Sequence, residues 1–239
     1  MFLLGFDPGS RFVRRSLMHV ISFAAVAAVA SAANAELLGQ WNFNTPLSSP
    51  VTHPFYVWNS EAGSADCNFT INTGDANTTF TTPAGNGSAY GLSADRWSTG
   101  DFAAITLNNL APGYRSFELS WDQTRTATGP SEFRVEVSLN NESFFVIPNS
   151  AYSVVQAGAL FSGTDPWTVN GPRQSSFTRT VQFEGLLVNS LPVTIRFVAT
   201  GANLGNGAAR FDNIVLTSVP APGAIALLGL AGLAGRRRR

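Results

Sequence analysis

Residues 116–147 read SFELSWDQTRTATGPSEFRVEVSLNNESFFVI and contain two segments in which apolar and polar side chains alternate. The apolar members are Phe117, Leu119 and Trp121 in the first segment and Phe133, Val135, Val137 and Leu139 in the second. A period of two places alternate side chains on opposite faces of a β-strand. We therefore predict two antiparallel strands, each with one face in a core and one in solvent. The turn Ser138-Leu139-Asn140-Asn141 should lead into the next hairpin strand.

The same pattern extends to both sides of this stretch. Val193, Ile195 and Phe197 alternate with polar residues, and helical periodicity is scarce. Further strand candidates are Leu37–Phe43, Phe102–Leu107, Phe144–Ile147, Phe177–Phe183 and Arg210–Thr217. The connectors are clusters of Gly, Asn, Ser, Thr and Pro, as in Thr82–Gly91 and Gly201–Ala208. Residues 36–218 are thus predicted to be one all-β domain, an antiparallel two-sheet sandwich of jelly-roll-like type.

The N-terminal residues 1–35 have the three parts of a secretory signal peptide. Residues 11–35 read RFVRRSLMHVISFAAVAAVASAANA, with basic residues first, an apolar run next and small residues at Ala33 and Ala35. Because signal peptidase admits only small side chains at these positions, we predict a signal helix that is cut after Ala35. The alternative is an uncleaved membrane anchor.

The C-terminal residues 219–239 read VPAPGAIALLGLAGLAGRRRR. The 12 residues from Ala224 to Gly235 carry no charge, and Arg236, Arg237, Arg238 and Arg239 end the chain. As a helix this run would span about 18 Å at ~1.5 Å per residue, less than the ~30 Å of a hydrocarbon core. It suits a weakly held transmembrane segment with a positive cytoplasmic stop better than a permanent anchor.

This tail resembles the PEP-CTERM sorting signal in its Val219-Pro220-Ala221-Pro222 start, its short Gly-, Ala- and Leu-rich helix and its Arg cluster. The resemblance implies recognition by an exosortase, a membrane-embedded transpeptidase that takes its substrate off the inner membrane of Gram-negative bacteria. The Glu that usually stands between the prolines is Ala221 here, which leaves open which sorting enzyme reads the tail. The resemblance covers residues 219–239 and implies nothing about the domain before them.

The charge and cysteine content of the domain restrict its partners. Residues 36–219 contain 8 basic and 14 acidic residues, which gives a net charge of 8 − 14 = −6. Nucleic acid binding needs clustered basic residues, so it is not expected. Cys67 is the only cysteine, and an intramolecular disulfide is therefore excluded.

Few residues point to catalysis or metal binding. His53 is the only histidine of the domain, and no Gly-x-Ser-x-Gly elbow occurs, so neither a hydrolase triad nor a zinc site is expected. We predict no cofactor. A structural calcium ion at Asp212-Asn213 is one alternative, and a strand-end hydrogen-bonding role for these residues is the other. A glycosidase needs two opposed carboxylates, and no local sequence singles out a pair.

Tryptophans carry the ligand hypothesis. Trp41 and Trp121 lie in strand patterns and are expected in the core. Trp58, Trp97 and Trp167 stand beside turn-rich segments, where exposed rings would suit stacking on sugars. The alternative is that these three rings close the ends of the sandwich.

The sequence therefore predicts a non-enzymatic surface or extracellular-matrix protein that is exported and sorted through its PEP-CTERM-like tail. Its expected partners are signal peptidase, an exosortase-type enzyme, transiently the inner membrane, and exopolysaccharide. Two alternatives remain for the domain: a carbohydrate-binding module for exopolysaccharide, and a secreted glycoside hydrolase. The three tryptophans sharing one exposed face would favour the first, and carboxylates lining a cleft would favour the second.

Overall fold

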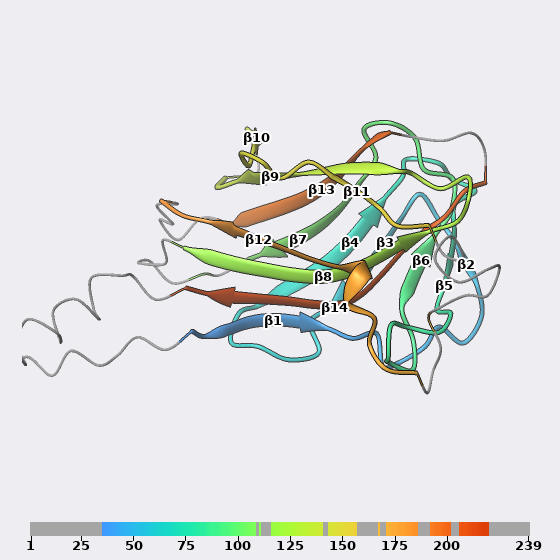
Figure 1. Ribbon diagram of the computed structural model, residues 1–239, viewed down its shortest axis with the longest axis horizontal. Coiled ribbons are helices and arrows are strands. Elements are labelled where there is room, and N and C mark those ends of the chain that lie inside the picture. Colours follow the sequence, from blue (N-terminus) through green and yellow to red (C-terminus); the bar gives the residue numbers. More distant parts are fainter. Residues whose placement is uncertain are drawn as a thin grey trace, which may run out of the picture.

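A computed structural model of the chain describes residues 35–108, 110, 116–140, 143–156, 167, 171–185, 192–201 and 206–219. Within these residues the secondary structure consists of β-strands and one short 3₁₀ turn, η1 (Ser175–Phe177). The strands form two antiparallel sheets that pack face to face (Figure 1). The predicted all-β class and two-sheet sandwich are thus confirmed.

The first sheet has seven strands among the described residues, and β14 runs through its middle. The path is β12-β8-β14-β6-β5-β2, and β1 also pairs with β14. β8 pairs with β14 over most of its length, while β6 and β1 pair with its first and last parts. The bounds are β1 (Leu37–Trp41), β2 (Val51–Thr52), β5 (Thr79–Thr81), β6 (Leu92–Ala94), β8 (Phe117–Arg125), β12 (Thr178–Phe183) and β14 (Ala209–Ser218).

The second sheet also has seven strands among the described residues, in the order β10-β9-β13-β7-β4-β3, with β11 paired to β9. β10 and β3 therefore lie at its opposite edges. The bounds are β3 (Phe55–Asn59), β4 (Cys67–Asn72), β7 (Phe102–Leu107), β9 (Glu132–Ser138), β10 (Phe145–Val146), β11 (Tyr152–Ser153) and β13 (Val193–Gly201). From β6 to β9 the chain changes sheet at each step, which joins the two layers by short crossings.

The core lies between the sheets and is filled by the side chains that the alternation placed inward. Phe117, Leu119, Val135 and Val137 are fully buried, as the sequence predicted. Aromatic rings from both layers meet there: Phe197 of β13 and Phe211 of β14 have centroids 5.8 Å apart. Trp41 and Trp121 are also buried, which confirms their assignment to the core.

Strand boundaries follow the sequence pattern closely for most of the predicted segments. Phe102–Leu107 is β7, and Phe144–Ile147 contains β10, which pairs with β9 as the predicted hairpin requires. Thr82–Gly91 is a loop without strand structure, as expected. β2, β3, β4, β5, β6 and β11 were not predicted. β4 nevertheless alternates strictly, with Cys67, Phe69 and Ile71 buried.

The two ends of the domain are held together. Glu36 N donates to Ser218 Oγ at 3.0 Å, and Ser218 N donates to Glu36 O at 2.9 Å. Of the predicted processing residues, Ala35 and Val219 flank this contact, whereas Ala33, Pro220, Pro222 and Arg236–Arg239 lie outside the described residues. The same is true of the two predicted flanking helices. No helix within the described part of the chain is long and apolar enough to cross a membrane.

Candidate functional site

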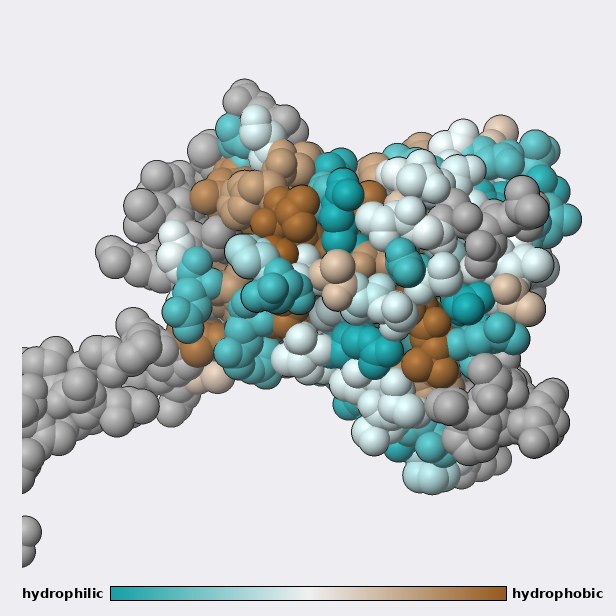
Figure 2. Space-filling view, turned by 45° about the horizontal axis from the view of Figure 1, so that its top comes forward, coloured by the Kyte–Doolittle hydropathy of each residue, from teal (hydrophilic) through white to brown (hydrophobic). Residues whose placement is uncertain are grey.

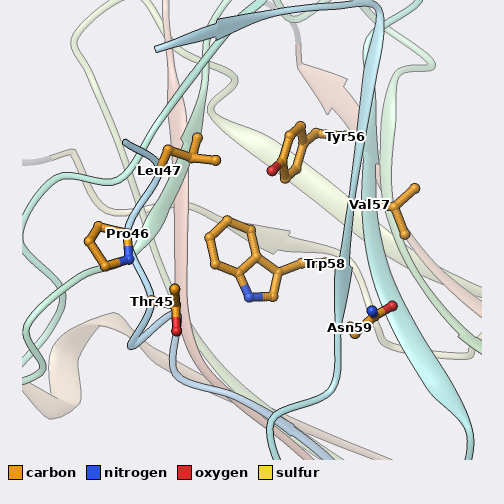
Figure 3. Close-up of a pocket in the computed structure, with 7 residues that line it drawn as sticks. All are labelled: Thr45, Pro46, Leu47, Tyr56, Val57, Trp58 and Asn59. Atoms are coloured by element: carbon orange, nitrogen blue, oxygen red, sulfur yellow. The ribbon is translucent and has the colours of Figure 1, made fainter. Parts of the chain in front are cut away.

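A hollow of about 310 Å³ lies beside the edge strand β3. Its lining residues come from β3 and from the segment before β2, and we call it the β3 groove: Thr45, Pro46, Leu47, Tyr56, Val57, Trp58 and Asn59. In Figure 3 the rings of Tyr56 and Trp58 point toward Leu47, Pro46 and Thr45 across the hollow, while Val57 and Asn59 point to the other side of β3. Two aromatic rings on one strand therefore form one wall of the groove.

The alternation of β3 explains this arrangement. Tyr56 and Trp58 are half-buried, whereas Phe55, Val57 and Asn59 are exposed. β4 pairs with β3 from Phe55↔Asn72 to Asn59↔Asn68 and holds one edge of the strand. The other edge has no paired strand among the described residues, which leaves the groove open there.

Packing against the core fixes the orientation of the Trp58 ring. Its centroid lies 5.4 Å from that of Phe43, with the rings nearly perpendicular at 77°. The Tyr56 ring lies 5.8 Å from the Trp58 ring on the same strand. Trp41 Nε1 also donates to the backbone oxygen of Trp58 at 3.1 Å. The aromatic wall is thus positioned before any ligand arrives, which lowers the entropic cost of binding.

The opposite wall is fixed by hydrogen bonds at both ends. The Glu61 carboxylate accepts hydrogen bonds from the backbone N–H groups of Asn42, at 3.3 Å, and Asn44, at 2.9 Å. Leu47 N donates to Thr82 Oγ1 at 3.1 Å. These contacts hold the Thr45–Leu47 wall at a set separation from Trp58.

The chemistry of the groove suits a neutral, amphipathic ligand. None of its seven lining residues is charged. Aromatic rings offer flat apolar surfaces, and the hydroxyl groups of Thr45 and Tyr56 offer hydrogen-bonding groups. A pocket with apolar walls and a few polar groups is the usual form of a small-ligand site.

The structure separates the three predicted ligand tryptophans. Trp58 is half-buried in the groove, on a strand instead of the predicted turn. Trp97 is only 2% exposed: its Nε1 donates to Ala94 O at 2.8 Å, and its ring contacts Phe133 and Phe211. The expectation of an exposed Trp97 ring was wrong, because its loop folds back onto the core.

Trp167 is also buried, at 1% exposure. Its ring contacts Phe177 of η1 edge-on at 5.8 Å, and the Arg210 guanidinium lies 5.5 Å from the ring centroid. Arg210 belongs to β14, so Trp167 packs beside the first sheet, whereas Trp58 belongs to the second. The three tryptophans therefore do not share one exposed face, the arrangement that would have favoured a carbohydrate-binding module. The alternative of rings that close the sandwich holds for Trp97 and Trp167.

Asp212 and Asn213 belong to a buried hydrogen-bond network on the first sheet. Asp212 accepts hydrogen bonds from Asn86 N at 2.7 Å and Ser88 Oγ at 2.6 Å. Asn213 Nδ2 donates to Asp122 at 2.9 Å. The hydrogen-bonding role predicted for Asp212-Asn213 is thus present, but both residues lie inside β14, where its pairing with β8 is irregular, and not at a turn or strand end. No group of three or more His, Cys, Asp or Glu side chains that would suit a metal occurs within the described residues.

Burial perturbs several titratable groups outside the groove. It raises the pKa of Asp212 to about 6, although Ser88, Asn86 and Asn213 donate hydrogen bonds to its carboxylate, and the charge of Asp122 raises it further. Burial likewise raises the pKa of Asp101 to about 6 and that of the Cys67 thiol above its usual value. Cys67 is packed in the core beneath Leu38, which makes it a structural residue.

His53, the histidine of the domain, lies just before β3. Its Nδ1 contacts Phe55 O at 2.7 Å, and its ring lies edge-on to Phe55 at 4.6 Å. No hydrogen bond between His53 and a serine or carboxylate is found within the described residues. His53 therefore orders the start of β3.

Tyr56, Thr45, Leu47 and Asn59 are groove residues that sequence reasoning missed. The run Phe55-Tyr56-Val57-Trp58-Asn59 contains three aromatics in five positions, and this density was the available signal. Thr45–Leu47 form a wall of the groove only through a tertiary contact, which a local sequence pattern does not indicate.

No protein-family model matches the chain, and no curated protein matches it. Solved structures with a similar outline include the CBM22-1–GH10 modules of the Clostridium thermocellum endo-1,4-β-D-xylanase 10B complexed with xylohexaose. The identity is 14%, the TM-score is 0.45, and the match covers 77% of this chain and 28% of that one. The chain thus spans less than a third of that enzyme.

Two further solved structures are matched over most of their own length. TmCBM61 in complex with β-1,4-galactotriose is 7% identical, with a TM-score of 0.34 and coverage of 70% of this chain and 89% of that one. The K3 cleaved adhesin domain of Lys-gingipain from Porphyromonas gingivalis is 12% identical, with a TM-score of 0.42 and coverage of 78% and 100%. The chain is similar to these proteins in fold outline.

Proposed function

We propose that this chain is an exported surface or matrix protein whose β-sandwich binds polysaccharide in the β3 groove. The observation that carries the proposal is the pair of half-buried rings, Tyr56 and Trp58, that face a hollow without charged lining residues. Apolar ring faces stack on the C–H faces of sugars, while hydroxyl and amide groups pair with sugar hydroxyls.

The activity in this proposal is binding rather than catalysis. A glycosidase needs two carboxylates that reach the scissile bond from opposite sides. Asp122 and Asp212 face each other, but both are fully buried on the first sheet, away from the groove. The groove lining contains no carboxylate. No observation therefore favours the hydrolase alternative.

Export and sorting belong to the same proposal and rest on the two ends of the sequence. A signal peptide at residues 1–35 and the PEP-CTERM-like tail at residues 219–239 would deliver the jelly-roll-like domain to the surface of a Gram-negative cell. Exopolysaccharide is abundant at that destination. The expected processing partners are signal peptidase and an exosortase-type enzyme.

Affinity electrophoresis of the full chain tests the binding. Gels are cast with hydroxyethylcellulose, dextran, galactomannan, xylan or the exopolysaccharide of the native host. At least one polymer should retard the wild type, with a dissociation constant no tighter than micromolar, about −8 kcal/mol. Retardation should persist in high salt, because stacking is screened less than ion pairing.

Substitutions in the groove provide the internal check. Trp58→Ala should migrate freely, and Trp58→Phe, which keeps an aromatic ring against Phe43, should retain part of the retardation. Phe145→Ala, at the opposite edge of the second sheet, should behave as the wild type. Circular dichroism establishes that each variant is folded. Free migration of the wild type in every gel, or equal retardation of folded Trp58→Ala, would refute polysaccharide binding at this groove.

A further inference from the structure

β3 exposes apolar side chains on the side opposite its two groove rings. Phe55 is 45% exposed and Val57 is 47% exposed. Together with Phe145 and Val146 of β10, they are the most exposed large hydrophobic side chains of the described residues. Figure 2 shows one face of the molecule, on which hydrophobic patches lie among hydrophilic residues. Of the two pairs, only Phe55 and Val57 adjoin the β3 groove.

The exposed pair lies on the outer side of β3, separated from the groove by the edge of this strand that is unpaired among the described residues. Val57 and Asn59 border the groove, but their side chains point to the outer side together with that of Phe55. A chain that leaves the groove over this edge of β3 meets Val57 on the outer side of the strand. Phe55 lies two residues away on the same side, about 6.6 Å at ~3.3 Å per residue.

Contacts at the start of β3 hold the Phe55 ring in place. The His53 ring packs edge-on against it at 4.6 Å and 84°. His53 Nδ1 lies 2.7 Å from Phe55 O and 3.3 Å from Phe55 N, so the two residues are linked through the backbone as well. An aromatic ring fixed in this way loses little freedom when a ligand stacks on it.

The surroundings of the exposed pair are polar and uncharged. Its cross-strand neighbours on β4 are Asn72, opposite Phe55, and Thr70, opposite Val57, and Asn68 lies opposite Asn59. Amide and hydroxyl groups next to apolar side chains match the alternating C–H and O–H groups of a sugar. The net charge of −6 in residues 36–219 opposes an anionic polymer.

We propose that Phe55 and Val57 form a second subsite, which makes the site specific for an extended neutral glycan that crosses β3. One sugar unit occupies the groove against Trp58 and Tyr56, and the following units lie on Val57 and Phe55 beside Thr70 and Asn72. This inference rests on the proposed polysaccharide binding at the groove.

The test uses the full chain and the neutral polymer that retards the wild type most strongly. Phe55→Ser should weaken binding roughly tenfold, equivalent to ~1.4 kcal/mol. Phe145→Ser is the matched control, because Phe145 is 44% exposed on the opposite edge of the same sheet and should leave binding unchanged. The carboxymethyl derivative of the same polymer should retard the wild type less than the neutral form at low salt.

Fragments of that polymer used as competitors measure the length of the site. Fragments of four or more units should compete with the wild type better than monosaccharides and disaccharides, and Phe55→Ser should abolish this advantage. Equal retardation of Phe55→Ser and Phe145→Ser, with Trp58→Ala still inactive, overturns the second subsite and leaves the groove intact. Stronger retardation by the carboxymethyl derivative overturns the neutral specificity. Absence of retardation by every polymer overturns the binding function and the subsite together.

Discussion

Asp122 of β8 and Asp212 of β14 lie directly opposite each other in the first sheet, and both side chains are fully buried. Two facing carboxylates repel each other strongly unless donors or cations compensate. Arg173 supplies the cation: its Nε and Nη2 lie 2.7 and 2.8 Å from the two oxygens of Asp122. Asn86 links the two carboxylates: its backbone N–H donates a hydrogen bond to Asp212, and its side-chain Nδ2 donates one to Asp122.

The acidic pair makes the stability of the domain depend on pH. The pKa of Asp212 is raised to about 6, chiefly by burial, whereas an aspartate in the unfolded chain has a pKa of ~3.9. The folded state therefore binds a proton more tightly. The resulting stabilisation is complete below about pH 4 and is lost as the pH rises through 6, by about 3 kcal/mol at most.

Urea unfolding of the wild type and of Asp212→Asn at a series of pH values measures this effect. Relative to Asp212→Asn, the wild type should lose stability between pH 4 and pH 7. Asp101→Asn serves as the control, because Asp101 also has a pKa raised to about 6 but lies outside the network. Its removal should leave the Asp212 contribution in place. Parallel pH profiles for the wild type and Asp212→Asn would contradict the prediction.

Arg173 should contribute more to stability than a typical surface arginine. Its hydrogen bond to Asp122 raises its own pKa, and Asp122 is fully buried. Arg173→Gln leaves a buried carboxylate without its cation, and the expected loss is about 3 kcal/mol in the free energy of unfolding.

Arg134→Gln is the comparison for Arg173→Gln. Arg134 is also partly exposed and also pairs with a carboxylate, that of Glu136, but Glu136 keeps a second partner in Arg196. We expect a smaller loss for Arg134→Gln, about 1 kcal/mol, because Arg196 still compensates the charge of the buried Glu136 carboxylate. Equal denaturation midpoints for the two variants would show that Arg173 does not compensate the acidic pair.

The sorting of the protein should depend on the terminal arginines. If Arg236, Arg237, Arg238 and Arg239 hold the tail at the cytoplasmic face, replacing all four by Ala should misdirect processing in the native host. Comparison of full-length and mature forms on a gel, together with surface labelling, measures the effect. Replacement of all four arginines by Lys, which keeps the positive charge, is the matched control and should leave processing unchanged. Unchanged processing and delivery of the four-alanine variant would contradict the sorting proposal.

The alternation of apolar and polar residues predicted the sandwich, because most strands have one buried face and one face in contact with solvent. Leu119, Val135 and Ile195 are fully buried, and each stands in a segment that alternates in the sequence. β3 gave no such pattern, since an edge strand with both sides partly exposed has no need of a polar face. Its sequence FYVWN is apolar almost throughout. Alternation could therefore not identify the groove strand, whereas β4 alternates and was overlooked.

The solvent exposure of the tryptophan side chains could not be predicted from the local sequence, for a different reason. Turn-rich flanks indicate a loop, but they do not indicate whether the loop folds over the sheet or extends into solvent. Trp97 packs into the core because its ring contacts those of Phe133 and Phe211, which are far away in the sequence. Trp58 remained half-exposed because the Thr45–Leu47 wall stands apart from it across the groove.

The pairing of Glu36 with Ser218 has a mechanical consequence. The proposed sorting tail follows β14 in the sequence, and the β3 groove lies near Trp41, at the end of β1 remote from Glu36. A ligand pulling on the groove while the tail is held would load β14 along its axis. β14 is hydrogen-bonded to β8 on one edge and to β1 and β6 on the other. These hydrogen bonds are perpendicular to the strand, so a force along β14 would load all of them together in shear. If the domain binds a polymer while its tail is held, β14 would therefore pass the force to its neighbours on both edges.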